Sequence, residues 1–345
     1  ARRNSVLQWI PRAMTNARVL FCASLILALF GPLMAQAQPA KTWRLGMLTV
    51  NPRPALAKSA IYIAFLQELR SLGYREGENL VIEWRHTDGH LDRPRQEAAA
   101  LMAWKPDVVF TVSGTNAIAL RNASASVPIV VGMGGDLVGM RLAATLARPG
   151  GNVTGQQLLS PDLAVKRLEL LTEVLPKLQR VAMLHAETQV DHGFYDRIFA
   201  DLQAAAPAVG VTMLRFTAKN GAEVESAFRE MAASKVDAVL VIASPFITAN
   251  RRRILALAAE RRIPTMHEVA DEADAGGLVA YGPKAEAMFR RGAHYVDRVL
   301  KGARPAEMPI EQPTQFELVI NRRSANALGV KIPASILVRA DRVIE

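Results

Sequence analysis

The sequence predicts an α/β protein made of two doubly wound, Rossmann-like lobes. Two observations lead to this prediction. Short, nearly continuous apolar runs alternate with amphipathic helix patterns, as in parallel sheets whose strands are covered on both faces. The alternation also begins twice, because residues 44–48 (RLGML) and 180–184 (RVAML) each open a new series.

The elements follow one another with short connections. Buried strands are expected at 44–50, 80–84, 107–112, 128–133, 180–185, 211–216, 237–243 and 278–281. Helices are expected between them at 60–72, 93–104, 115–124, 164–175, 194–209, 222–233, 247–261 and 286–300. Because open parallel sheets bind ligands at the carboxyl ends of their strands, two facing lobes predict a ligand cleft between them.

The first 37 residues have the pattern of an export signal. Arg18 precedes an apolar run at 19–30 (VLFCASLILALF), and Ala35-Gln36-Ala37 has the form of a cleavage site. The run is about 12 residues long, whereas a bilayer-spanning helix needs roughly 20. We therefore expect residues 1–37 to be removed and the mature protein to be periplasmic; the alternative is an N-terminal membrane anchor.

Composition and motifs exclude several classes of function. The only cysteine, Cys22, lies in the signal, so the mature chain would have neither a disulfide nor a thiol nucleophile. The net charge is +10, but the arginines at 251–253 and 261–262 have no interleaved aromatic residues and indicate a solvated helix face, not a nucleic-acid site. The common motifs for a nucleophilic serine, a P-loop or a zinc protease are absent. We expect no catalysis, no metal and no cofactor; a hydrolase on this scaffold is the disfavoured alternative.

The strongest candidate for ligand binding in the first lobe is the segment 112–116 (VSGTN). It ends a predicted strand and opens a helix, so Ser113, Gly114, Thr115 and Asn116 would present hydroxyl and amide groups at a helix N-terminus, which suits a carboxylate. Helix capping by Ser113 or Thr115 is the structural alternative. Asn51 ends the first strand and would face the same cleft.

Other candidates follow other strands. Asp136 comes after strand 128–133 and could pair with an ammonium group, or simply begin a helix. From the second lobe we expect contributions at Glu187, Ser244, His267 and Glu268. Tyr281, at the end of a strand near a hinge, is a further candidate. Either glutamate could instead be a surface residue, and Tyr281 could pack within the protein.

Four stretches carry a family resemblance. They are 146–155 (LARPGGNVTG), 251–258 (RRRILALA), 275–283 (AGGLVAYGP) and 311–321 (EQPTQFELVIN), the last followed by 327–329 (ALG). With them the chain resembles ABC-transporter substrate-binding proteins related to the tryptophan- and tyrosine-binding group, which have the type I periplasmic binding fold. The chain departs from that group at Asn116, Leu137, Glu187 and His267, where proline, proline, the Asn-Pro pair and an aromatic residue are common.

The resemblance implies an organisation and a function. A three-segment hinge would join lobe 1, residues 38–156 plus 279–312, to lobe 2, residues 157–278 plus 313–345. The protein would be a monomer that binds a small amphipathic ligand, with aromatic amino acids the known type, and delivers it to an ABC permease in the inner membrane. The alternative is a periplasmic sensor that delivers the same ligand to a signalling receptor.

Overall fold

The computed structural model describes residues 41–158, 160–186 and 193–345. The predicted export signal and Glu187 therefore lie outside the described residues. No helix within those described ranges has the length and apolar character needed to cross a membrane.

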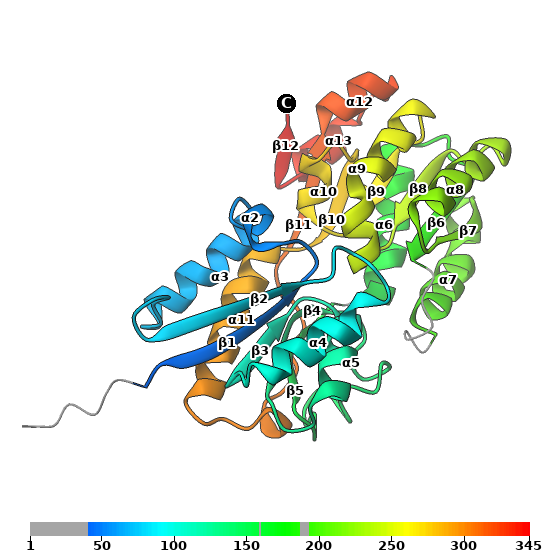
Figure 1. Cartoon of the computed structure of the whole chain (residues 1–345). Coiled ribbons are helices and arrows are strands. Elements are labelled where there is room, and N and C mark those ends of the chain that lie inside the picture. The colour runs from blue at the N-terminus through cyan, green and yellow to red at the C-terminus, as the bar shows by residue number, and fades with distance from the viewer. Residues whose placement is uncertain (1–40, 159, 187–192) are drawn as a thin grey trace, which may run out of the picture. The chain divides into compact units, whose positions relative to one another are not determined.

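The first sheet is entirely parallel and has the strand order β2-β1-β3-β4-β5. Its strands are β1 (Trp43–Thr49), β2 (Leu80–His86), β3 (Val108–Thr111), β4 (Ile129–Gly134) and β5 (Val153–Gln157). Helices α3 (Ala60–Ser71) and α11 (Ala285–Leu300) lie side by side on one face, and α4 (Arg93–Ala103) and α5 (Gly114–Ala123) cover the other (Figure 1). We call this body lobe 1; the short α2 (Arg53–Leu56) also belongs to it.

The second sheet has the order β12-β11-β10-β9-β8-β6-β7. Its strands are β6 (Arg180–Ala186), β7 (Thr212–Ala218), β8 (Ala238–Val241), β9 (Thr265–His267), β10 (Val279–Pro283), β11 (Phe316–Asn321) and β12 (Arg342–Ile344). Only the β10–β11 pair among these is antiparallel. The helices of this body, lobe 2, are α6 (Ser160–Val174), α7 (Phe194–Ala205), α8 (Gly221–Ala233), α9 (Pro245–Glu260), α10 (Ala270–Asp274), α12 (Arg322–Leu328) and α13 (Ala334–Arg339).

Strand β6 shows why the apolar runs are nearly continuous. Val181 and Met183 are buried in one core cluster together with Ile198 of α7. Ala182, the residue between them, is buried in another cluster with Phe228 of α8. Since neighbouring side chains of a strand point to opposite faces, both faces must be apolar when helices cover both. The structure thus confirms the predicted fold class of two doubly wound α/β lobes.

Three segments of the chain pass between the lobes. The first follows β5, the second joins β10 to α11, and the third runs from Glu311, which is bridged to Gln156, into β11. Strand β10 was assigned to the first lobe from the sequence, but it pairs with β9 and β11 of the second sheet. The second passage therefore comes after Pro283, and not before residue 279.

Candidate functional site

A cavity of about 830 Å³ is lined by residues that follow strands of both sheets. Lobe 1 contributes residues after β1, β3 and β4, and lobe 2 contributes residues after β8 and β9. Its volume is in the range of pockets for small-molecule ligands. Both lobes must contact anything that fills it, as the sequence predicted from the facing strand ends.

Two serines begin helices at this cavity in matching positions. Ser113 precedes α5, and its Oγ accepts a hydrogen bond from the Asn116 amide at 3.3 Å. Ser244 precedes α9, and its Oγ accepts one from the Ile247 amide at 3.1 Å. Each serine caps a helix and also lines the cavity, so the capping and binding interpretations of Ser113 are compatible.

The lobe 1 wall combines hydroxyl groups with apolar side chains. Asn51, Gly114 and Thr115 line the cavity beside Ser113. Deeper apolar surface comes from Leu56, Ile61, Tyr62, Met133 and Phe289, which belong to α2, α3, the end of β4 and α11. The rings of Tyr62 and Phe289 meet edge to face with centroids 5.0 Å apart, and burial raises the pKa of the Tyr62 hydroxyl. This wall can accommodate an apolar or aromatic group next to a polar one.

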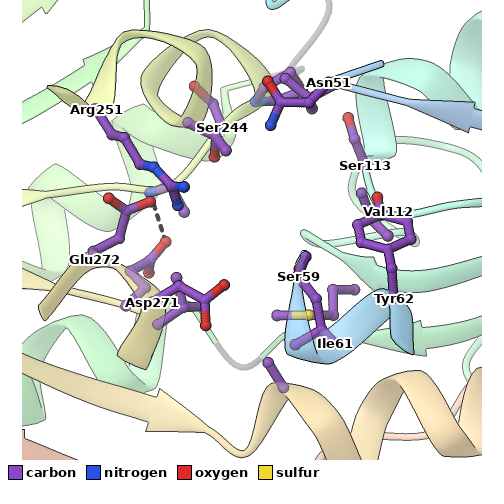
Figure 2. Close-up of a pocket in the computed structure, with 18 of the residues that line it drawn as sticks. Asn51, Ser59, Ile61, Tyr62, Val112, Ser113, Ser244, Arg251, Asp271 and Glu272 are labelled. Carbon is purple, nitrogen blue, oxygen red and sulfur yellow. Dashed lines mark hydrogen bonds between the residues drawn. The ribbon is translucent and has the colours of Figure 1, made fainter. Parts of the chain in front are cut away.

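The lobe 2 wall is charged. Arg251 and Arg252 reach it from α9, and Asp271, Glu272 and Asp274 reach it from the short α10. Figure 2 shows Arg251, Asp271 and Glu272 across the cavity from Ser59, Ile61 and Tyr62. The arginines were interpreted from the sequence as a solvated helix face, and Arg252 and Arg253 are indeed exposed. Arg251 and Arg252 also line the cavity, which the sequence did not predict, whereas Arg253 pairs with Glu225.

Glu268 lines the cavity but is already neutralised. Its side chain is 3% exposed. The carboxylate accepts one hydrogen bond from Nη1 of Arg167 at 2.7 Å and another from the Ala243 backbone N–H at 2.7 Å. Arg167 also donates Nε to the Tyr281 carbonyl, and its pKa is lowered by burial. The backbone is so close here that a Cβ at Gly282 would stand 1.8 Å from the Glu268 carbonyl oxygen. This buried pair joins α6, β8, β9 and β10.

Four further predicted residues lie outside the cavity lining. Asn116 is fully buried and contacts a separate cavity of about 20 Å³. His267 is buried with Nε2 2.8 Å from Thr265 Oγ1, and burial lowers its pKa to about 3, which keeps the imidazole neutral. Tyr281 stacks on Phe316. The contacts of these three side chains are with the protein itself, which indicates a structural role.

Asp136 is the fourth. Its Oδ1 accepts the Gly139 amide at 2.7 Å, and its Oδ2 is 3.0 Å from Nη2 of Arg197 on α7. The carboxylate that was predicted to pair with a ligand ammonium therefore has a partner from the other lobe.

Several lining residues were missed from the sequence. Asp271, Glu272 and Asp274 follow β9, a three-residue strand that the apolar pattern did not reveal. Tyr62 and Phe289 come from helices α3 and α11, which are remote in sequence and meet only because both cover the same face of the lobe 1 sheet. In the ranges that the structure describes, His, Cys, Asp and Glu form no group of three that could hold a metal ion.

Known proteins resemble this chain over most of its length. A tyrosine-binding protein of Clostridioides difficile (strain R20291) is 24% identical over 293 residues, which are 84% of this chain and 82% of that protein. A conserved domain protein of Vibrio cholerae O1 biovar eltor has a structure with a TM-score of 0.80 and 26% identity, covering 88% of this chain and all of that one. An ABC domain of Streptococcus pneumonia, solved in complex with L-Trp, gives a TM-score of 0.79 and 25% identity with the same coverage.

A family model decides the assignment. Residues 53–344 match the model described as ABC transporter substrate binding protein, and the match spans both lobes. The two α/β lobes, the three passages between them and the cavity that both lobes line are in keeping with that match. The chain belongs to the ABC transporter substrate-binding protein family.

Proposed function

We propose that this protein is the exported solute-binding component of an ABC transporter and that it binds an amino acid, with aromatic ones favoured, in the cavity between its lobes. The observation that carries the proposal is the pairing of a hydroxyl-rich, aromatic wall in lobe 1 with a charged wall in lobe 2. The related proteins described as binding tyrosine or L-Trp support the ligand class.

The lobe 1 wall offers a place for the ligand carboxylate. Ser113 and Thr115 carry hydroxyls at the start of the ten-residue helix α5, where the first backbone N–H groups have no intrahelical acceptors. The helix dipole adds a partial positive charge at the same point. The aromatic ring would lie against Tyr62, Ile61 and Phe289.

Transport requires binding and release, and no bond in the ligand changes. A ligand that contacts both walls stabilises the closed arrangement of the lobes over the open one. A permease that recognises the closed arrangement would then receive loaded protein in preference to empty protein. The export pattern at residues 1–37 supports a periplasmic location for this exchange.

Thermal unfolding with a panel of amino acids tests the proposal. A ligand at about 1,000 times its Kd adds roughly 4 kcal/mol to the stability of the native state, which moves the midpoint by several degrees. We expect the largest shifts with L-tryptophan, L-tyrosine or L-phenylalanine. A panel in which aromatic amino acids give no shift would contradict the ligand class, and turnover of any bound compound would contradict the binding role.

A further inference from the structure

Four carboxylates line the cavity, and two of them are already paired. Glu268 is held by Arg167 and by a backbone amide. Asp274 receives both terminal nitrogens of Arg342, at 2.5 and 2.8 Å. Neither has its charge available to a ligand.

The other two, Asp271 and Glu272, are different. Neither side chain forms a hydrogen bond or an ion pair with any residue of the described ranges, and both face the cavity (Figure 2). Glu272 is only 7% exposed, and no described residue forms a hydrogen bond or an ion pair with its carboxylate. Leaving a polar group in that state costs free energy, and a cation that entered the cavity would recover part of it.

Their surroundings raise the pKa of both side chains. Burial raises the pKa of Glu272 to about 7 and also raises the pKa of Asp271. The positive charge of Arg251 opposes both shifts. The charge of Asp271 adds to the rise in the pKa of Glu272, and the charges of Asp274 and Glu286 add to that of Asp271. At neutral pH Glu272 is therefore partly ionised. Arg251 is the nearby positive charge, but no described residue forms a hydrogen bond or an ion pair with either carboxylate.

We propose that Asp271 and Glu272 bind the cationic group of the transported ligand. This deepens the proposed function and rests on it. The ligand is then a compound with an ammonium or similar cationic group next to an apolar body, oriented with the cation toward lobe 2. The opposite wall supports this orientation, because its described lining residues include one charged side chain, Lys58, among apolar and hydroxyl groups.

Three related probes separate the cationic group from the rest of the ligand. L-Tryptophan has both an ammonium and a carboxylate, tryptamine keeps only the ammonium, and 3-indolepropionate keeps only the carboxylate. Isothermal titration of the full protein at about pH 8 should give binding of L-tryptophan and measurable binding of tryptamine. Binding of 3-indolepropionate should be at least about tenfold weaker than that of L-tryptophan, since it leaves both acids unpaired.

Variants assign the effect to residues. Glu272→Gln and Asp271→Asn should each weaken L-tryptophan by about tenfold or more, and should leave the weak binding of 3-indolepropionate unchanged or improved. Asp274→Asn is the matched control, because it removes the same charge from the same helix at a carboxylate that Arg342 already holds. It should change the Kd less than threefold. Unchanged thermal unfolding cooperativity would show that all variants fold.

The outcomes distinguish the two proposals. If the wild-type protein binds L-tryptophan but neither Glu272→Gln nor Asp271→Asn weakens it, the assignment of the cation to these residues is wrong. The same holds if 3-indolepropionate binds as tightly as L-tryptophan. If the wild-type protein binds none of the three probes, the aromatic ligand class of the proposed function is wrong, and this inference falls with it.

Discussion

The two walls of the cavity differ in how their polar groups are satisfied. On the lobe 1 wall the polar groups are hydroxyls, amides and a single charged side chain, Lys58, and Ser113 is already engaged as a helix cap. On the lobe 2 wall there are acids and arginines, some paired and some without a partner in the described structure. Removing water from a wall of hydroxyl and apolar groups costs little free energy when the hydroxyls keep their hydrogen bonds. A charged group without a partner is stable only in contact with water or a counter-ion. In the proposed binding mode, lobe 1 therefore contacts the apolar body and the carboxylate of the ligand, and lobe 2 contacts its cationic group.

The paired and unpaired acids of lobe 2 should respond oppositely to mutation. Arg167→Met removes the partner of Glu268, where both side chains are 3% exposed. Loss of one member of such a buried pair leaves an uncompensated charge, so we expect the free energy of unfolding to fall by about 3–5 kcal/mol. Urea denaturation measures this loss.

The double variant Arg167→Met with Glu268→Gln is the control for that prediction. It removes both charges, so it should recover a good part of the stability that the single variant loses. A single variant as stable as the wild-type protein would show that the Arg167–Glu268 pair contributes little to the lobe 2 wall.

Removing the unpaired acid should stabilise the empty protein. The ordinary pKa of Glu272, 4.5, is raised to about 7 by burial, so the folded state favours the protonated form. The contribution of Glu272 to the free energy of unfolding is fully present below its unfolded pKa. It is lost as pH rises through about 7, and the loss is roughly 3 kcal/mol at most. Glu272→Gln avoids that loss. Its advantage in unfolding free energy over the wild-type protein should be absent near pH 4 and grow up to pH 8; a constant difference across this range would contradict the shift.

The same titration should appear in ligand affinity. A cationic ligand pairs with ionised Glu272, so L-tryptophan binding should weaken as pH falls below about 7, by up to tenfold per pH unit. Arg251 and Asp271 share this environment and broaden the transition. Titration calorimetry between pH 5 and 8 measures the profile. Glu272→Gln should flatten it, and an equally steep profile in that variant would assign the titration to another group.

Much of the fold could be predicted from the sequence because buried parallel strands consist of short, continuous apolar runs. Strand β6 and its neighbours were found in this way, and so were Ser113 and Ser244, because a small polar residue between a strand and a helix is a local signal. Strands β5, β9, β11 and β12 were missed. VTGQQ is too polar, and TMH and RVI are too short, to form such a run, whereas FELVIN in β11 is apolar enough and was overlooked.

The site was harder to predict because it depends on distant partners. Asp136 and Asp271 are both acids in loops or short helices near strand ends, and nothing local distinguishes them. Arg197, which lies far along the chain on another lobe, pairs with Asp136, while no described residue pairs with Asp271. Whether a charge is available to a ligand is thus decided by tertiary contacts.

The smallest expected effect concerns the hydroxyls, and it tests the neutral side of the comparison. Thr115 on the lobe 1 wall and Thr248 on the lobe 2 wall both line the cavity and are both half-buried. Replacing either by valine keeps the shape and removes one hydroxyl. If the carboxylate of L-tryptophan lies at the start of α5, Thr115→Val should raise the Kd about threefold to tenfold, because the loss of one hydrogen bond costs about 1 kcal/mol. Thr248→Val should change the Kd less, because the lobe 2 wall is proposed to contact the ligand through carboxylates and not through this hydroxyl. Equal losses in the two variants would mean that the ligand carboxylate contacts both lobes. The division by which lobe 1 binds the carboxylate and lobe 2 binds the cationic group would then have to be abandoned.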